Sequence, residues 1–328
     1  MRLTSFLLLS VFSVTLFTLT LAQMVLSNEP PILISLFAFL FGTMLIALSN
    51  EYEDIRIKGP PKGQNGVHFV NMTFAVIIGA SVTYLLHNAL PLNAVIAAAF
   101  VGMVSAVFFK KQATPLYCGA FVGMSCSTFL PTLFCIFIAG IVSACLYQSS
   151  RTFLNGYGGK LGAIALVGTF VSSIAMGHPL QQAPLNDWNQ GIILIIYAIV
   201  ASTLTFRLHN YCSVSPVFAS SFVSFAGTLL ILLFNPSNND LILLVMMAGT
   251  FAGMTSLNRL PSTKYLVLTG LAVGILFMFS QPYFDLAGGK LGLIAFMAVL
   301  STRGMIDLLQ SIRSRMPTRS QVKHLLSS

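Results

Sequence analysis

One segment of the chain repeats a segment that lies 130 residues earlier, and this duplication is the strongest constraint on the fold. Residues 119–166 and 249–296 align without a gap and are identical at 16 of 48 positions. The longest shared run is Gly-Gly-Lys-Leu-Gly, at 158–162 and at 288–292, followed in both copies by one variable residue and Ile-Ala. An internal repeat of this length predicts two copies of one structural unit.

The repeated segments are apolar, and so is nearly all of the chain. Its 328 residues are 56% hydrophobic and 8% charged, with a mean hydropathy of +0.86. A soluble domain carries roughly 25% charged residues, so we predict an all-α polytopic membrane protein. In such a chain the net charge of +9 is typical of basic cytoplasmic loops, and nucleic acid is not an expected partner.

Twelve apolar segments predict about 12 transmembrane helices, each of which needs about 20 mostly apolar residues. They cover residues 4–26, 31–49, 68–86, 93–109, 115–131, 132–149, 161–177, 190–207, 215–234, 241–257, 265–281 and 288–305. Segments 115–131 and 241–257 are short and contain glycine, so a re-entrant or broken helix is the alternative there. Residues 1–22 also have features of a cleavable signal peptide. The long apolar run that follows Arg2 favours a retained anchor instead.

The basic residues test this assignment, because Lys and Arg collect in cytoplasmic loops. With a cytoplasmic N-terminus, 16 of the 17 basic residues fall on the inner side, and Lys290 is the exception. A miscounted segment would have inverted every later loop. The alternation therefore predicts a multi-pass protein of a bacterial inner membrane, with both termini in the cytoplasm.

The repeat extends backwards through Leu-His-Asn, at 86–88 and at 208–210, with an offset of 122 residues. Each unit then holds five segments, over residues 68–177 and 190–305. Because five is odd, the two units cross the membrane in opposite senses. Such inverted repeats are typical of transporters, with the solute path between them.

The parts outside the two units are short. Residues 1–50 hold two N-terminal transmembrane helices, 51–67 a cytoplasmic loop, 178–189 an outer loop, and 306–328 a basic cytoplasmic tail. The start of this tail has apolar residues at helical spacing. It is interpreted either as an interfacial helix or as an ordinary tail.

Each Gly-Gly-Lys motif is predicted to open the last helix of its unit. Free backbone N–H groups at a helix start, together with Lys160 or Lys290, are suited to bind an anion. The alternative is a tight glycine turn that serves packing, with two lysines that mark the membrane interface. The glycines concerned are Gly158, Gly159, Gly288 and Gly289.

Further matched pairs are candidates to line the solute path. They are Asn155 and Asp285, the pairs His87–Asn88 and His209–Asn210, and Ser125 and Thr255. Asp285 lies five residues before Lys290, so neutralisation of that lysine is an alternative role for it. An imidazole can contact a solute or a proton, although a structural histidine is the commoner case. The hydroxyls follow a Gly-x-Phe-x-Gly-Met segment whose glycine spacing favours close helix packing.

The remaining observations narrow the function. All eight acidic residues lie in predicted loops or at segment ends, so no intramembrane carboxylate is expected to hold Na⁺ or H⁺. The chain has no nucleotide-binding, hydrolase or metalloprotease motif and no CxxC pair. We therefore expect no enzyme, cofactor or metal, but a transporter or channel for a small anionic or neutral solute. Expected partners are membrane lipid, the solute and a second copy of the chain. The alternative is a non-transporting membrane subunit that scaffolds partners or handles lipid.

Overall fold

The computed structural model describes residues 2–57, 66–90, 92–178, 190–234 and 240–315. This described part contains twelve helices and no strands. The helices are α1 (Arg2–Leu26), α2 (Pro31–Ile57), α3 (Gly66–Asn88), α4 (Ala94–Phe108), α5 (Ala113–Gly123), α6 (Leu133–Ser150), α7 (Lys160–Ala175), α8 (Gly191–Tyr211), α9 (Pro216–Phe234), α10 (Asp240–Gly253), α11 (Thr263–Ser280) and α12 (Lys290–Arg315). Each predicted apolar segment overlaps one of them, so the prediction of an all-helical protein is confirmed for the described residues.

The lengths of the helices separate two groups within the described residues. Eight helices have at least 18 residues and are apolar enough to cross a membrane, which supports a multi-pass membrane protein. The helices α4, α7 and α10 are apolar but shorter. The shortest, α5, has 11 residues and is about 16 Å long, roughly half the hydrocarbon thickness of a bilayer. Segments 115–131 and 241–257 therefore hold helices that end early, at Gly123 and Gly253.

Two helices extend furthest beyond their predicted apolar segments. The helix α2 continues to Ile57, so the first part of the expected loop 51–67 is helical. The helix α12 continues to Arg315 and includes the start of the expected tail. Most of the outer loop 178–189 and the last thirteen residues of the tail lie outside the described residues.

Two helices begin at equivalent positions of the two repeats with the same kind of cap. The Thr132 hydroxyl accepts a hydrogen bond from the Cys135 N–H at the start of α6, at 3.2 Å. The Ser262 hydroxyl accepts one from the Lys264 N–H at the start of α11, at 3.4 Å. A hydroxyl at this position satisfies a backbone donor that has no partner inside the helix. A proline precedes each cap in the sequence.

The helices of the two halves have corresponding packing partners. The helix α3 packs against α4, α5 and α6, and α8 packs against α9, α10 and α11. The closest approaches occur at glycines four residues apart. A side chain at Gly119 or Gly123 would meet the backbone of α3, and one at Gly249 or Gly253 would meet the backbone of α8. These glycines therefore allow the short helices α5 and α10 to lie directly on their neighbours.

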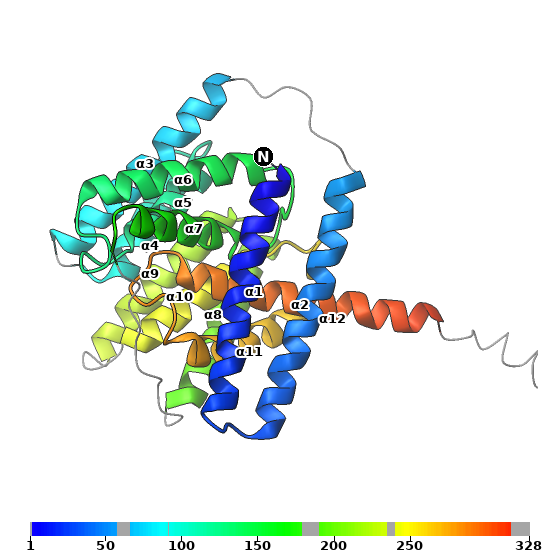
Figure 1. Ribbon diagram of the computed structural model, residues 1–328. Helices are drawn as coiled ribbons and strands as arrows, with labels where there is room; N and C mark the ends of the chain where they lie inside the picture. Colours follow the sequence, from blue (N-terminus) through cyan, green and yellow to red (C-terminus); the bar gives the residue numbers. More distant parts are fainter. Residues whose placement is uncertain (1, 58–65, 91, 179–189, 235–239, 316–328) are drawn as a thin grey trace, which may run out of the picture.

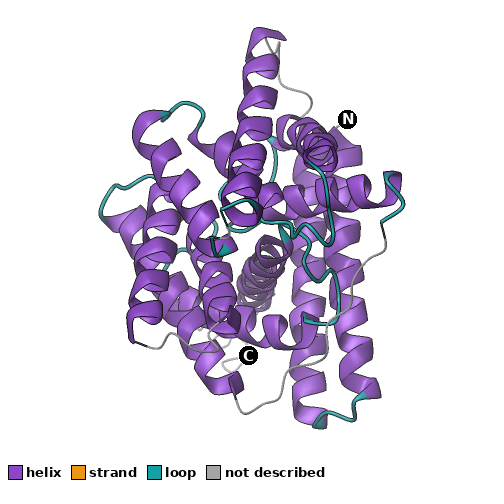
Figure 2. Ribbon diagram, turned by 90° about the vertical axis from the view of Figure 1, so that its left-hand side faces the viewer, coloured by secondary structure: helices purple, strands orange, loops and turns teal. Residues whose placement is uncertain are grey.

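The two halves meet through α4 and α9 and through α7 and α12. Among the eight long helices, α12 is the most enclosed, since 78% of its apolar window is buried, compared with 33% for α2. Figure 1 shows α1 and α2 side by side, with α12 running across α2. Gly304 lies against the Thr43 carbonyl at this crossing and leaves no space for a side chain. In Figure 2 some helices are seen along their axes and others from the side, so they do not form one parallel bundle.

Candidate functional site

The two Gly-Gly-Lys motifs lie against each other near the centre of the molecule. The second glycine of each motif precedes its helix with a positive φ, 79° at Gly159 and 95° at Gly289. A side chain at Gly162 would collide with the Cα atom of Gly292, and the reverse collision occurs at Gly292. The packing interpretation thus accounts for the last two of the three glycines in each motif, because α7 and α12 cross backbone to backbone at these points.

The first glycine of each motif contacts the short helix of the other half. Gly158 lies on the C-terminal carbonyls of α10, and its N–H donates to Thr255 Oγ1 at 3.1 Å. Gly288 lies on the C-terminal carbonyls of α5, and its N–H donates to Ser125 Oγ at 3.1 Å. Both hydroxyls are fully buried. Ser125 and Thr255 therefore join the two halves, and each uses its acceptor on a backbone N–H of the protein.

The two matched asparagines hold the chain that follows each short helix. The Asn88 amide donates to the Ser125 carbonyl at 3.3 Å and accepts from the Ser127 N–H at 3.0 Å. The Asn210 amide donates to the Thr255 carbonyl at 3.1 Å and accepts from the Leu257 N–H at 3.3 Å. A side-chain amide that both donates and accepts a hydrogen bond can satisfy the backbone C=O and N–H groups that are unpaired where a helix ends.

Lys160 is buried at the start of α7, but its ammonium group reaches back to the preceding chain. The Nζ atom donates to the carbonyls of Ser150 and Phe153, both at 2.6 Å, and to Asn155 Oδ1 at 3.4 Å. Ser150 is the last residue of α6. A cation is favourable at a helix C-terminus, where the carbonyls carry partial negative charge. Lys160 therefore stabilises the end of α6, and three protein acceptors occupy its three donors.

Lys290 has the equivalent position at the start of α12 with fewer partners. Its Nζ atom donates to the Gln281 carbonyl at 3.0 Å, directly after α11. The ion pairs among the described residues do not include one between Lys290 and Asp285. Lys290 therefore binds a carbonyl at the end of α11, as Lys160 does at the end of α6. Its ammonium group makes one hydrogen bond to the described protein, whereas that of Lys160 makes three.

Two cavities flank the crossing of the two motifs. One has a volume of about 400 Å³, and the other about 280 Å³. The larger, here the Lys290 cavity, is lined by Lys290, Gly288, Gly289, Asp285 and His87. The smaller, the Lys160 cavity, is lined by Lys160, Gly158, Gly159, Asn155 and His209. Ten of the fourteen residues predicted for the site thus line equivalent cavities, whereas Asn88, Asn210, Ser125 and Thr255 support the backbone around them.

Two phenylalanines belong to both cavities. Phe121 and Phe251 line the Lys290 cavity and the Lys160 cavity, and their ring centroids are 4.4 Å apart. Each residue is 1% exposed, so the two rings are almost fully buried where the linings of the two cavities meet. Both histidines bind a nearby carbonyl through Nδ1 at 2.9 Å, which leaves the second ring nitrogen of each without a bond to the described protein.

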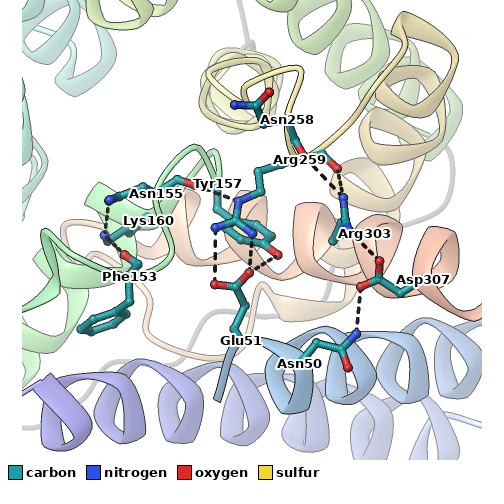
Figure 3. A network of polar contacts seen from close by, with 10 residues as sticks. All are labelled: Asn50, Glu51, Phe153, Asn155, Tyr157, Lys160, Asn258, Arg259, Arg303 and Asp307. Atoms are coloured by element: carbon teal, nitrogen blue, oxygen red, sulfur yellow. Dashed lines mark hydrogen bonds and ion pairs between the residues drawn. The ribbon is translucent and has the colours of Figure 1, made fainter. Parts of the chain in front are cut away.

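A polar network that the sequence analysis missed lies beside the Lys160 cavity. The Arg259 guanidinium forms an ion pair with Glu51, and the Tyr157 hydroxyl donates to the same carboxylate at 3.1 Å. The guanidinium carbon also lies 4.3 Å from the centroid of the Tyr157 ring. Burial raises the pKa of the Tyr157 phenol and the Glu51 carboxylate raises it further, so the hydroxyl keeps its proton. Figure 3 shows these residues joining α2 to the loop before α7.

The network continues along α12. Arg303 donates to the Arg259 carbonyl at 3.1 Å and pairs with Asp307 at 2.8 Å, one helical turn further on. Asn50 donates to the other Asp307 oxygen at 3.0 Å (Figure 3). Among the described residues the network has no counterpart on the Lys290 side, where Phe129 and Ala287 occupy the positions equivalent to Arg259 and Tyr157. The network could therefore not be predicted from the repeat. Glu51 lies in the predicted loop 51–67, where an exposed carboxylate is expected.

Comparisons of the chain with protein-family models, with curated proteins and with solved structures find no match. The function of the two cavities is therefore argued from their own geometry and chemistry.

Proposed function

We propose that the chain is an integral membrane transporter or channel for a small anionic or neutral solute. The observation that carries this proposal is the pair of equivalent cavities on either side of Phe121 and Phe251. In this proposal the two cavities, which share Phe121 and Phe251 in their linings, are the two halves of an interrupted path. Solute sites between repeats are a common feature of transporters.

In this proposal the two halves are inverted repeats of five helices, α3 to α7 and α8 to α12, and α1 and α2 are an additional pair. The corresponding packing partners and the exchanged Gly158–Thr255 and Gly288–Ser125 hydrogen bonds support a two-fold relation. The odd number of helices in each half, together with the distribution of basic residues, supports opposite membrane orientations.

The proposed location is a bacterial inner membrane with both chain termini in the cytoplasm. The Lys160 cavity then opens towards the cytoplasm, because Arg151 lines it and Arg259 and Arg303 lie beside it. The Lys290 cavity opens to the opposite side, where Asp240 and Asp285 contribute to its lining. This distribution follows the preference of basic residues for the cytoplasmic face.

The test is solute flux into proteoliposomes that contain the purified chain. Met124 and Met254 occupy equivalent positions, one in each cavity, so Met124→Trp and Met254→Trp insert a large ring into the proposed path. We expect each variant to reduce flux at least about tenfold, the effect of a barrier raised by about 1.4 kcal/mol. The half-buried Met72 lines neither cavity, and Met72→Trp is the matched control.

Two results would contradict the proposal. One is a folded wild-type chain that moves no member of a broad panel of small anions and neutral solutes, which would favour the non-transporting subunit. The other is flux that Met124→Trp and Met254→Trp leave at the level of Met72→Trp, which would place any path elsewhere in the molecule.

A further inference from the structure

We propose that the Phe121–Phe251 pair is the selectivity barrier of the path and that it admits uncharged solutes in preference to ions. This inference rests on the proposed function, and it narrows the solute class from anionic or neutral to neutral. Its basis is the position of the two rings, which line both cavities and are in contact with each other.

The two rings are held at this position by the repeated motifs. Phe121 and Phe251 lie in the last turns of α5 and α10. Gly288 packs against the Phe121 carbonyl and Gly158 against the Phe251 carbonyl, and any side chain at either glycine would push the helix end away. Each half of the protein therefore fixes the barrier residue of the other half, and the Gly-Gly-Lys motif acts on the path through the backbone.

A third ring extends the barrier. The Tyr117 ring centroid lies 4.3 Å from that of Phe121 and 6.2 Å from that of Phe251. The Tyr117 hydroxyl is turned to a buried hydrogen bond with Ser220, at 3.1 Å. All three side chains are almost fully buried, so the barrier presents aromatic carbon and no charged group.

The chemistry of such a barrier separates solutes by charge. An ion that passes between apolar rings loses its hydration shell and finds no replacement, whereas a small neutral molecule loses only a few hydrogen bonds. Lys160 has no donor left for an anion, because three protein acceptors occupy its ammonium group, and the Lys290 ammonium group is bound to the Gln281 carbonyl at the end of α11. The preference for a neutral solute over an ion of the same size should be roughly a hundredfold.

The first experiment compares formamide with formate, which have the same number of heavy atoms and differ in charge. Flux is measured in proteoliposomes and corrected for empty vesicles. We expect the wild type to pass formamide and to exclude formate, and the double variant Phe121→Ala/Phe251→Ala to lose most of this preference. The variant Phe121→Leu/Phe251→Leu keeps an apolar wall and should retain the exclusion of formate.

The control for a large buried ring is Phe37→Ala in α2. Phe37 is fully buried and lines neither cavity, and its ring centroid lies 4.9 Å from that of Phe17. It should leave the formamide-to-formate ratio unchanged. The inference is overturned if the wild type passes formate as readily as formamide, or if the double alanine variant keeps the wild-type ratio.

A second experiment tests the barrier even if no solute moves. Cys126 lines the Lys290 cavity and is partly exposed. A small membrane-impermeant thiol reagent should modify Cys126 from one face of the vesicle in the wild type. In Phe121→Ala/Phe251→Ala it should react from both faces. The same chains with Cys126→Ser provide the blank, and Ser256→Cys reports from the Lys160 cavity.

The two experiments separate the two proposals. Absence of flux with one-sided labelling that becomes two-sided in the double variant would reject transport of these probes and support the barrier. Labelling of Cys126 from both faces of the wild type, or from a single face in the double variant, would overturn the barrier.

Discussion

Gly162 and Gly292 face each other where α7 crosses α12, and neither position has room for a side chain. The two residues are equivalent members of the repeated motifs, so one local sequence is used on both sides of the same contact. The crossing brings together the two glycine turns, the two cavities and the ends of α5 and α10. The repeated sequence therefore forms the interface between the two halves as well as the corresponding helices within each half.

The first prediction concerns this crossing. Gly162→Ala and Gly292→Ala each force a methyl group into the opposite backbone and should destabilise the fold by about 1–3 kcal/mol or more. Gly42→Ala in α2 is the control, because a side chain there meets nothing within 4 Å. Thermal unfolding in detergent should show a lower midpoint for the first two variants only. Unchanged midpoints for them would mean that α7 and α12 do not approach this closely.

The second prediction separates the two lysines. Lys160→Met leaves two carbonyls and an amide oxygen without their donor, whereas Lys290→Met leaves one carbonyl. A buried acceptor that loses its partner costs roughly 1–3 kcal/mol. We therefore expect the loss of unfolding free energy to be clearly greater for Lys160→Met. The measurement is unfolding in an SDS titration. Equal losses of unfolding free energy for the two variants would show that the three hydrogen bonds of Lys160 do not contribute more than the single one of Lys290.

The third prediction concerns the attachment of α2. Glu51 and Arg259 form a partly buried pair, with side chains 9% and 22% exposed. Removal of one partner leaves the other charge uncompensated. A double-mutant cycle with Glu51→Gln and Arg259→Gln should give a coupling of about 1–3 kcal/mol.

The exposed Arg313 supplies the matched control for this cycle. Arg313→Gln combined with Glu51→Gln should be additive, because no described contact joins the two residues. A Glu51–Arg259 coupling as small as this control would show that the ion pair does not anchor α2.

The fourth prediction tests the proposed orientation by thiol labelling in a Cys126→Ser background. Native Cys212 and Lys110→Cys should react from the cytoplasmic face, because both are exposed at helix ends on the basic side. Ser27→Cys and Phe234→Cys should react from the opposite face. If Cys212 and Lys110→Cys are labelled from different faces, the two halves are not inverted as proposed.

Much of the fold could be predicted because its determinants are local. A long apolar segment in lipid forms a helix, because lipid offers no hydrogen-bond partners and the backbone N–H and C=O groups must bond to each other. The positions of the twelve helices and the equivalence of 119–166 with 249–296 are readable along the chain, whereas a break in the segments that contain α5 and α10 is only one of two alternatives. The grouping of Lys160 with Asn155 and of Lys290 with Asp285 likewise follows from short separations in the sequence.

The contacts that define the site depend on groups far apart in the chain, and only tertiary packing selects them. Phe121 and Phe251 are the phenylalanines of the repeated Gly-x-Phe-x-Gly-Met segment, but nothing in that segment shows that their rings meet across the two halves. Gly158 donates to Thr255 across 97 residues, and Arg259 reaches Glu51 across 208. The repeated Gly-Gly-Lys motif could be identified from sequence. Its lysines bind the carbonyls at the ends of α6 and α11, and its first glycines pack on the ends of α10 and α5, because tertiary packing brings these groups within reach.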